Sequence, residues 1–494
     1  MLYLCFPTKN YYWDGIAFAM DIEDAGRLSP TLLHQNHLIY NVVGYLAYKL
    51  FRLTGAQVRA IEVLQVVNSM LSALCAFVLF HISRISFRSH YLSIVLTLLF
   101  AFSATWWKFS TDANSYISST LLLLSSFYLL LPARKPSPIA VAILHTASML
   151  LHQLAVFFYP VAVAGILLQT SGLNLNRRIT AVLQYSAVAF LLTVATYYCC
   201  FYLLTGTLDP FTFSQWVSSY SSGTEGFSFD VMSNLAFTLR GHVRLFWGGR
   251  INLLRDFVSP PIVLLIVLLL VAFAYLCVQL VRHLGELKSF AASALQSTRK
   301  VGAVGTLALV WATPYLVFCF FFYPQDAFHR LVYFPSLILL LGVVLANYDP
   351  RSSHQRHWRA ALFVIVLALS NFLFLIYPYS HVRKETPLFL ALEMQHRWSR
   401  ETVIFYAAFN SDNVTLRYFN PDTNWKPLGL AGVEEIEYGL LKVYNNGGNA
   451  WIETSAIDRI RQLPEGANWL ATHAKESYEL TDPAYKLKVV RIAP

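Results

Sequence analysis

Charged residues are scarce in this 494-residue sequence, and long apolar runs take their place. Asp, Glu, Lys and Arg make up 13% of the chain, against about 25% in an average soluble domain. One run, PPIVLLIVLLLVAFAYLCV at 260–278, approaches the roughly 20 residues that cross a bilayer. The composition excludes an ordinary soluble protein and predicts an integral membrane protein with many spans.

Other features that the sequence lacks exclude further classes of protein. The six cysteines have no zinc-ligand spacing, and five of them lie in apolar runs. NNGG at 445–448 is a turn signal and does not fit the glycine-rich pattern of a dinucleotide-binding loop. The net charge of +10 comes from Lys and Arg spread over many short loops rather than gathered in basic runs. We therefore expect no nucleic-acid partner, no zinc site of cysteines and no dinucleotide site.

Ten apolar runs are candidate membrane spans, and one of them is short and interrupted by histidines. They lie near 60–83, 91–109, 115–132, 139–151, 154–170, 179–204, 260–281, 301–323, 329–347 and 359–379. We therefore expect an all-α polytopic membrane domain.

Basic residues mark one alternating set of loops between these runs. That set contains Arg84, Arg88, Arg134, Lys135, Arg177, Arg178, Arg282, Lys288, Arg299, Lys300, Arg351, Arg356 and Arg359. The short loops of the other set hold only Lys108 and Arg330. Because Lys and Arg concentrate in short cytoplasmic loops, the first set is predicted to be cytoplasmic. The opening stretch, the 205–259 loop and the tail after 380 then lie outside the cytoplasm.

The composition changes near residue 385. ETVIFYAAF, AWIETSAIDRI and YKLKVVRIAP combine strand-like and helix-like patterns, and NNGGN reads as a turn. We expect a transmembrane domain at 1–384, with outer loops 1–59 and 205–259, and a small extracytoplasmic α/β domain at 385–494.

Acidic residues outside the tail gather on the predicted outer side, which suggests a site there. Asp14 precedes a helical-looking run and is either an N-cap or a functional carboxylate. Asp112 lies where one span leaves the membrane and the next begins, and a helix cap is again the alternative. Asp21, Glu23 and Asp24 are expected to be the solvated end of a helix that Gly26 closes.

Histidines and arginines add further candidates. His34 and His37 stand three residues apart and would share a face if that segment is helical. His152, between two spans, needs a partner if it is buried. Arg330 and Arg250 either snorkel to the membrane interface or bind a phosphate, which guanidinium groups bind in a bidentate manner.

Three short motifs resemble those of the GT-C membrane glycosyltransferases, on the protein O-mannosyltransferase side. YWDGIAF, LHQNHLIY and DANSY stand where the bacterial branch of that side has DSGE, HPPGYPLY and AEVY. HQNH replaces HPP, and ANSY lacks the glutamate of AEVY, so that Asp112 is the nearest acid. The resemblance covers about residues 11–380.

The resemblance implies transfer of a hexose, with inversion, from a polyprenyl-phosphate carrier to a protein, glycan or lipid hydroxyl outside the cytoplasm. It makes Asp14 the candidate general base and Asp112 a second catalytic acid. The candidate substrate-binding residues are His34, His37, His152, Arg250, His329 and Arg330. It also implies a bacterial inner-membrane location. No metal site is assigned, and a need for a divalent cation is left open.

The resemblance also bears on the start of the chain. MLYLCFPTKN is too short to span a membrane and looks like the stub of a first helix, so that eleven spans are expected in all. A signal peptide is excluded, because no basic segment and apolar core precede Asp14.

Three alternatives remain beside this enzyme. A secondary transporter or lipid flippase needs ionisable groups near the middle of the membrane, whereas the acids here lie near one surface. A polymerase or ligase of cell-surface glycans would use the same chemistry. A glycosyltransferase-like protein with a decayed site would keep the fold without the activity.

Overall fold

The computed structural model describes residues 1–218, 226–282, 302–347, 353–382, 386–408, 411–428, 433–482 and 485–493. They divide into two compact units. The helical unit consists of Met1–Pro7 and Asp21–Pro378, and the α/β unit of Thr8–Met20 and Tyr379–Pro494. Four of the basic residues used for the topology, Lys288, Arg299, Lys300 and Arg351, lie outside the described residues.

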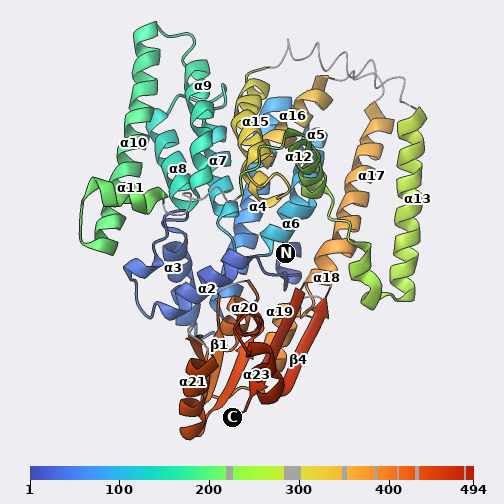
Figure 1. The fold of residues 1–494 in the computed structure, drawn as a ribbon. Coiled ribbons are helices and arrows are strands. Elements are labelled where there is room, and N and C mark those ends of the chain that lie inside the picture. Colours follow the sequence, from blue (N-terminus) through green and yellow to red (C-terminus); the bar gives the residue numbers. More distant parts are fainter. Residues whose placement is uncertain are drawn as a thin grey trace. The chain divides into compact units, whose positions relative to one another are not determined.

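The helical unit is built from helices of very different lengths (Figure 1). The α-helices are α1 (Leu2–Cys5), α3 (Tyr40–Leu53), α4 (Ala60–Phe87), α5 (His90–Ala101), α6 (Ala104–Ser110), α7 (Tyr116–Leu129), α8 (Pro138–Leu151), α9 (Tyr159–Gln169), α10 (Leu175–Thr205), α11 (Pro210–Ser218), α12 (Val231–Phe246), α13 (Pro260–Arg282), α15 (Ala303–Phe321), α16 (Phe334–Asn347) and α17 (Ser353–Asn371). Short 3-10 helices are η1 (Pro30–Leu32), η2 (Gln153–Phe158), η3 (Ile251–Phe257) and η5 (Phe328–Val332), and η7 (Phe372–Ile376) is a π-helix. Helices α2 (Trp13–Asp24) and α18 (Tyr377–Tyr379) contribute residues to both units.

Each of the ten predicted runs contains helix, and the predicted polytopic fold is confirmed. Five helices among the described residues are long and apolar enough to cross a membrane: α4, α10, α13, α15 and the segment Trp358–Tyr379. Four shorter apolar helices cover other predicted runs.

One predicted span is not a single straight helix. The run at 91–109 forms α5 and α6, which meet at an angle of 67°. At this break the Ser103 hydroxyl donates to the Leu99 carbonyl oxygen, and Phe102 ends α5. The bend redirects α6, which leads into the Asp112 turn.

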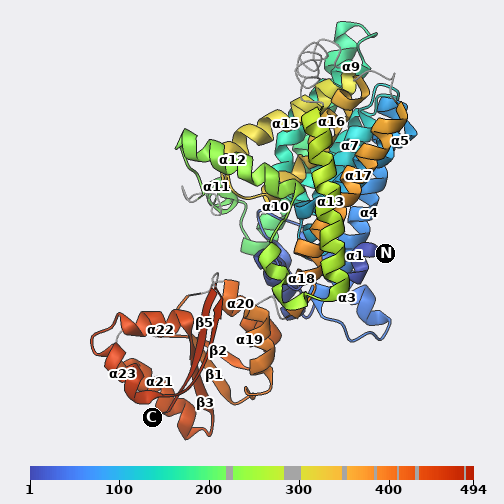
Figure 2. The ribbon, with the colours of Figure 1, turned by 90° about the vertical axis from the view of Figure 1, so that its right-hand side faces the viewer.

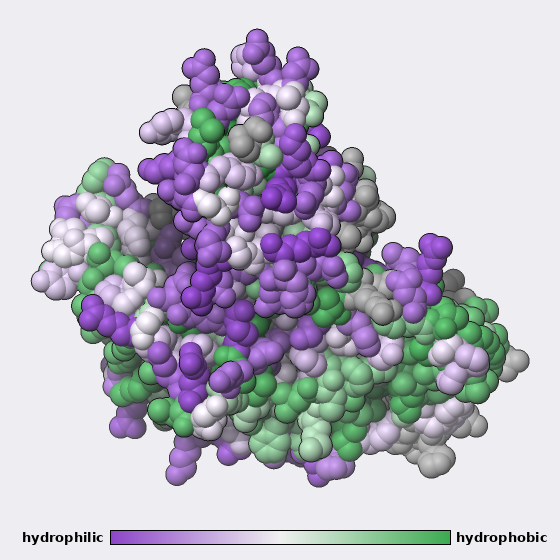
Figure 3. Space-filling view, turned by 90° about the horizontal axis from the view of Figure 1, so that it is seen from below, coloured by the Kyte–Doolittle hydropathy of each residue, from purple (hydrophilic) through white to green (hydrophobic). Residues whose placement is uncertain are grey.

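The outward faces of the spans are apolar, as a lipid environment requires. Only 6% of the most apolar 18-residue stretch of α13 is buried within the protein. Figure 3 shows hydrophobic residues gathered over α13 and a mainly hydrophilic surface over the α/β unit. The protein is therefore an integral membrane protein.

Helix α4 lies at the centre of the bundle and packs against α5 and α7. Near its N-terminal end it carries a row of buried polar side chains: Gln65, Asn68, Ser69 and Ser72. Their spacing of three and four residues places them on one face of the helix. This polar face turns toward the segment between α6 and α7, where the candidate site lies.

The predicted outer loop at 205–259 contains α11, α12 and η3, and its residues 219–225 lie outside the described part. Helix α12 packs on the bundle through Asn234, Gly241 and Leu245. A β-carbon on Gly241 would lie 2.7 Å from Cζ of the fully buried Arg330. Gly241 thus allows α12 to close over the Arg330 guanidinium.

Replacing Gly241 by Ala is expected to lower the thermal unfolding midpoint. Alanine normally stabilises a helix by about 1 kcal/mol relative to glycine. Here the added carbon meets a guanidinium whose two Nη atoms donate to the carbonyl oxygen atoms of Asp326 and Pro324, and overpacking costs about 1–3 kcal/mol. Thermal unfolding in detergent measures the change. Gly172→Ala is the matched control, because no atom lies within 4 Å of its added carbon; a Gly241→Ala midpoint at or above the wild-type value would contradict the packing.

The α/β unit has one five-stranded sheet between two layers of helices (Figure 2). Its strands are β1 (Thr402–Tyr406), β2 (Asn424–Pro427), β3 (Asn449–Glu453), β4 (Ala474–Asp482) and β5 (Tyr485–Ile492), and its helices are α19 (Thr386–Gln395), α20 (Ser411–Phe419), α21 (Val433–Asn445), α22 (Thr454–Arg461) and α23 (Gly466–His473). The order is β2-β1-β3-β5-β4. Strand β1 pairs in parallel with β2 and β3, whereas β5 is antiparallel to β3 and β4.

The predicted mixture of strands and helices in the tail is confirmed. ETVIFYAAF contains β1, AWIETSAIDRI contains the end of β3 and most of α22, and YKLKVVRIAP contains β5. The NNGGN turn has Gly447 at φ +75°, a value that glycine adopts without strain. The exact domain boundaries stay a prediction, and the α/β unit also takes in Thr8–Met20 from the predicted outer loop.

Candidate active site

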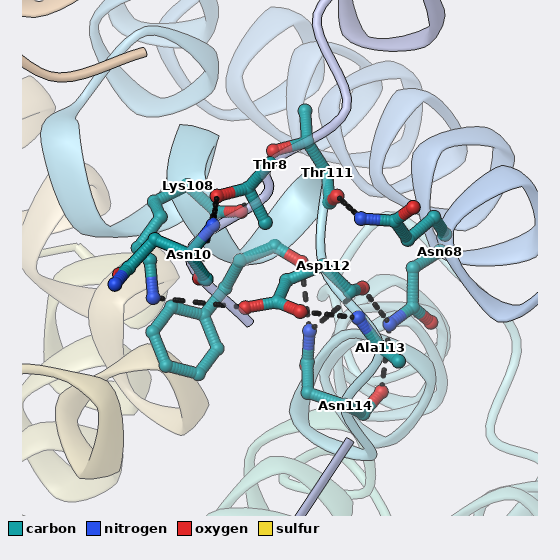
Figure 4. Close-up of polar contacts among 10 residues, drawn as sticks. Thr8, Asn10, Asn68, Lys108, Thr111, Asp112, Ala113 and Asn114 are labelled. Atoms are coloured by element: carbon teal, nitrogen blue, oxygen red, sulfur yellow. Dashed lines mark hydrogen bonds and ion pairs between the residues drawn. The ribbon is translucent and has the colours of Figure 1, made fainter. Parts of the chain in front are cut away.

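A tight turn between α6 and α7 is held by side chains of α4 (Figure 4). The Asn68 Nδ2 atom donates to the carbonyl oxygen atoms of Asp112 (2.7 Å) and Asn114 (2.9 Å). Gln65 Nε2 donates to the Thr111 carbonyl oxygen at 2.9 Å, and Ser69 Oγ donates to that of Ser110 at 3.0 Å. These buried bonds fix the backbone of a segment that has no regular structure of its own.

The Asp112 carboxylate is fully buried within this turn. One of its oxygen atoms accepts a hydrogen bond from the Ala113 amide at 2.9 Å, and the other lies 3.6 Å from the Lys108 ammonium. Lys108 is the last cation before the turn, and its side chain is 18% exposed. Asp112 is therefore one half of a mostly buried ion pair rather than a helix cap; Asn114 instead accepts from the Ile117 amide in the first turn of α7.

Four histidines gather beside the start of α7, and all four are candidates from the sequence. The His34 and His37 rings are stacked with centroids 5.8 Å apart, and the His37 and His152 centroids are 4.7 Å apart. The centroid of the Tyr116 ring lies 4.3 Å from that of His152 and 6.2 Å from that of His329. The structure thus joins segments from three other parts of the chain around Tyr116.

His34 and His37 do not lie on a helix, so the condition for a shared helical face is not met. They occupy a turn between η1 and α3, in which the His34 Nδ1 atom accepts from the Asn36 amide at 3.2 Å. His37 is tied to the start of α7, because its Nδ1 atom and the Ser115 hydroxyl are 2.9 Å apart. A turn brings the two rings together as effectively as a helix would.

These imidazoles are held in their neutral forms. Burial, with His34 as a second cause, lowers the pKa of His37 to about 3. Burial, with Arg330 as a second cause, also lowers the pKa of His329 to about 3. Burial lowers the pKa of His34 as well. Near neutral pH the cluster therefore supplies hydrogen-bonding nitrogen atoms without positive charge.

Arg330 lies in the same 3-10 helix as His329 but points away from solvent. Its side chain is fully buried, and both Nη atoms donate to backbone carbonyl oxygen atoms. Asp326, whose pKa is raised by burial and lowered by Arg330 and Arg244, lies beside it. Arg330 therefore fixes the turn that presents His329, and a direct contact with substrate stays a prediction.

Arg250 is exposed and near other arginines of the 205–259 loop. Burial, with Arg240 and Arg250 as further causes, lowers the pKa of Arg244. Three guanidinium groups are thus close enough to act on one another electrostatically. Such a group of cations suits a phosphate.

Asp14 lies in the α/β unit and is the second residue of α2. The N-cap interpretation is therefore not what the structure shows, although a carboxylate in the first turn of a helix is favourable. Asp14 is partly buried. Burial raises the pKa of the Asp14 carboxyl, and a hydrogen bond from Tyr12 opposes that rise.

Of the other acids of α2, Glu23 differs from the predicted solvated helix end, whereas Asp21 is exposed as predicted. Glu23 accepts from the Arg59 guanidinium and from the Ala60 amide at 2.7 Å, and so joins α2 to the start of α4. Asp21 accepts from the Asn41 amide group at 3.2 Å. Asp24 is exposed, as expected.

Several residues of the site were not identified from the sequence: Gln65, Asn68, Ser69, Lys108 as the partner of Asp112, Ser115 and Tyr116. The polar row at three- and four-residue spacing in an apolar span was the available signal for the α4 residues, because polar groups within spans are costly. The roles of Lys108 and Tyr116 could not be predicted from the sequence, because their contacts depend on the path of the chain around the turn.

Metal binding has little structural support in this part of the protein. Among the described residues, no group of three or more His, Cys, Asp and Glu side chains is arranged to hold a metal ion. The need for a divalent cation stays open.

No protein-family model matches the chain, and no curated protein sequence matches it. Solved structures do. ArnT from Cupriavidus metallidurans in the apo state matches with a TM-score of 0.64 and 12% identity, over 99% of this chain and 95% of ArnT. The same ArnT bound to undecaprenyl phosphate matches with a TM-score of 0.59 and 13% identity, over 96% of this chain and 92% of ArnT.

These matches show the fold. A polytopic membrane domain with a small C-terminal domain, as in ArnT, is confirmed as the architecture of this chain, and membership of the GT-C superfamily stays a prediction. The O-mannosyltransferase-like branch and its motifs stay a prediction.

Proposed function

We propose that this protein transfers a sugar from a polyprenyl-phosphate carrier to an acceptor hydroxyl at the outer surface of the membrane. The observation that carries the proposal is the likeness, over 96% of the chain, to ArnT bound to undecaprenyl phosphate. The acceptor is a protein, a glycan or a lipid, and the transferred group is a hexose that inverts at its anomeric carbon.

The reaction places three demands on the protein. The acceptor oxygen forms a bond to the anomeric carbon while the bond from that carbon to the phosphate oxygen breaks. The carrier phosphate leaves with the electron pair, and the acceptor proton passes to a base. A phosphate is a good leaving group, so the protein must mainly supply a base, cations for the phosphate and contacts that orient the sugar.

Residues of this chain can meet each demand. Asp14 is the proposed base, as the resemblance implies. The arginines at 240, 244 and 250 are the proposed phosphate contacts, because Arg240 and Arg250 both lie close enough to Arg244 to lower its pKa, and a group of cations suits a phosphate. The ion pair of Asp112 and Lys108 is proposed to stabilise charge that develops during the reaction near the start of α7. The neutral histidines around Tyr116 provide contacts to substrate.

A transporter or flippase is the second candidate, because the fold consists largely of apolar spans. It is less well supported. The polar residues of α4 are used in bonds to the Asp112 turn, near one end of that helix. Reconstitution with polyprenyl-phosphate sugars separates the two functions: an enzyme releases polyprenyl phosphate and forms a glycosidic bond, whereas a flippase moves the intact lipid.

Transfer is expected to fall at acidic pH, at a pH above the ordinary titration range of an aspartate. A base must be deprotonated, and burial raises the pKa of Asp14; protonation therefore removes activity as the pH falls through that raised pKa. His37 and His329 have pKa values of about 3 and do not titrate in this range. A profile of kcat/KM against pH measures this loss of activity on the acidic side. A midpoint of the loss at or below the ordinary aspartate range, near pH 3.9, would contradict the assignment of Asp14 as the base.

A further inference from the structure

Two ring nitrogen atoms in the histidine cluster lack a hydrogen-bond partner. They are Nε2 of His152 and Nδ1 of His329, and both atoms are buried. The His152 side chain is only 6% exposed. Its Nδ1 atom accepts from the Leu154 amide at 3.2 Å, so the proton of the neutral ring lies on Nε2. A buried N–H without an acceptor is unfavourable and calls for an explanation.

The two histidines converge from distant parts of the chain. His152 lies between α8 and η2, and His329 lies in η5. Both rings contact Tyr116, the first residue of α7. His152 and His329 are also close enough for a charge on His329 to lower the pKa of His152 further. The two unpartnered nitrogen atoms therefore belong to one small region.

The neighbouring cations have most of their donors engaged elsewhere, although the buried Nε atom of Arg330 has no partner. The Arg330 guanidinium donates to the carbonyl oxygen atoms of Asp326 and Pro324, and the Lys108 ammonium faces Asp112. What the region offers is two neutral imidazoles. Neutral nitrogen atoms suit a neutral group, whereas a phosphate calls for cations such as those of the 205–259 loop.

A hydroxyl group fits this pair best, because it can accept from one imidazole and donate to the other. Aromatic rings surround the pair. The ring centroids of Phe328 and Tyr116 are 5.9 Å apart. Tyr323 is stacked on His329, with ring centroids also 5.9 Å apart. Apolar walls with a few placed polar groups are typical of small-molecule sites, and a sugar ring presents both C–H faces and hydroxyl groups.

We infer that His152 and His329 bind a hydroxyl group of the transferred sugar, with Tyr116 and Phe328 against its ring, and that this sugar is uncharged. The inference rests on the proposed function and assigns one of its subsites. The pair is a specificity determinant: it distinguishes a neutral sugar from one that carries an amino or carboxylate group.

The structure suggests two replacements of His152 that separate its two nitrogen atoms. Asparagine can keep the acceptor for the Leu154 amide but has no atom at the position of Nε2. Glutamine reaches further and places an N–H donor near that position. We expect His152→Asn to lower kcat/KM for a neutral sugar donor by about 10–100-fold, the effect of one lost hydrogen bond in a buried site, and His152→Gln to restore part of it. A purely structural role would favour Asn over Gln.

Sugar donors that lack a single hydroxyl group give a sharper test than the His152 variants alone. Polyprenyl-phosphate glucose, mannose and galactose, and their singly deoxygenated forms, are assayed with the wild-type protein, His152→Asn and His329→Phe. For one ring position, removing the hydroxyl should cost the wild-type protein about as much as the His152 change costs with the intact donor. The two losses should not add when they are combined. His90→Phe is the control, because His90 is exposed at the start of α5.

The outcomes distinguish failure of the inference from failure of the proposed function. If the wild-type protein transfers no sugar from any donor, the proposed function fails. If it transfers sugars but the losses add at every ring position, the histidines bind no sugar hydroxyl and the inference is wrong. The same assay includes polyprenyl-phosphate glucosamine and glucuronic acid, and a wild-type preference for either one over the neutral sugars would likewise overturn the inference.

Discussion

Replacing Asp14 by Asn is expected to reduce sugar transfer by roughly 10²–10⁴-fold, the usual contribution of a general base. Asparagine keeps the size of the side chain and much of its hydrogen bonding but cannot take up the acceptor proton. The protein should still fold, because the change in charge within the first turn of α2 is worth only about 0.3–1 kcal/mol. Initial rates with a working donor, together with the thermal unfolding midpoint, measure both effects.

Asp24→Asn is the matched control for this change. Asp24 ends the same helix, carries the same charge and is exposed, and exposed substitutions usually change stability by no more than about 0.5 kcal/mol. Its activity should stay near the wild-type value. Near-normal transfer by Asp14→Asn would remove Asp14 from the mechanism and direct attention to Asp112 and Asp326.

Replacing Asp112 by Asn is expected to reduce both activity and stability. The change leaves the mostly buried Lys108 ammonium without its carboxylate. Because the Lys108 side chain keeps some contact with solvent, we expect a loss of about 1–3 kcal/mol of stability. Transfer should fall by about 10²–10³-fold, as when a fixed electrostatic contact is removed.

A double variant separates a structural from a chemical role of Asp112. In Asp112→Asn combined with Lys108→Met, no unpaired ammonium remains, so stability should recover. If Asp112 acts in the reaction, transfer should stay low in the double variant. Recovery of transfer together with stability would show that Asp112 serves only to neutralise Lys108.

The membrane architecture could be predicted from the sequence because apolar runs of sufficient length have few alternatives. The bend between α5 and α6 could not, since the run stays apolar through Phe102 and the break depends on local hydrogen bonds. In the tail, β1 and β5 follow clear apolar patterns. Strand β2 is a four-residue edge strand that ends in Pro427, and β4 carries several charged residues, so neither pattern was visible.

The site was predicted in its residue types more than in its geometry. His34 and His37 were paired by spacing, although a turn rather than a helix brings their rings together. His152 and His329 were separate candidates, and only the tertiary fold places both beside Tyr116. Arg330 was expected at the membrane interface or on a phosphate, yet it is fully buried under Gly241. Single-residue signals thus identified chemistry, and long-range packing determined how it is arranged.

Transfer by the purified wild-type protein in liposomes of defined lipids tests the central claim most directly. The liposomes carry a panel of polyprenyl-phosphate sugars labelled in the sugar, with peptide and glycan acceptors supplied on both sides of the membrane. The account predicts a labelled acceptor and free polyprenyl phosphate in equal amounts, both lost with Asp14→Asn. Movement of the intact labelled lipid across the bilayer without a labelled acceptor would contradict it and identify a transporter instead.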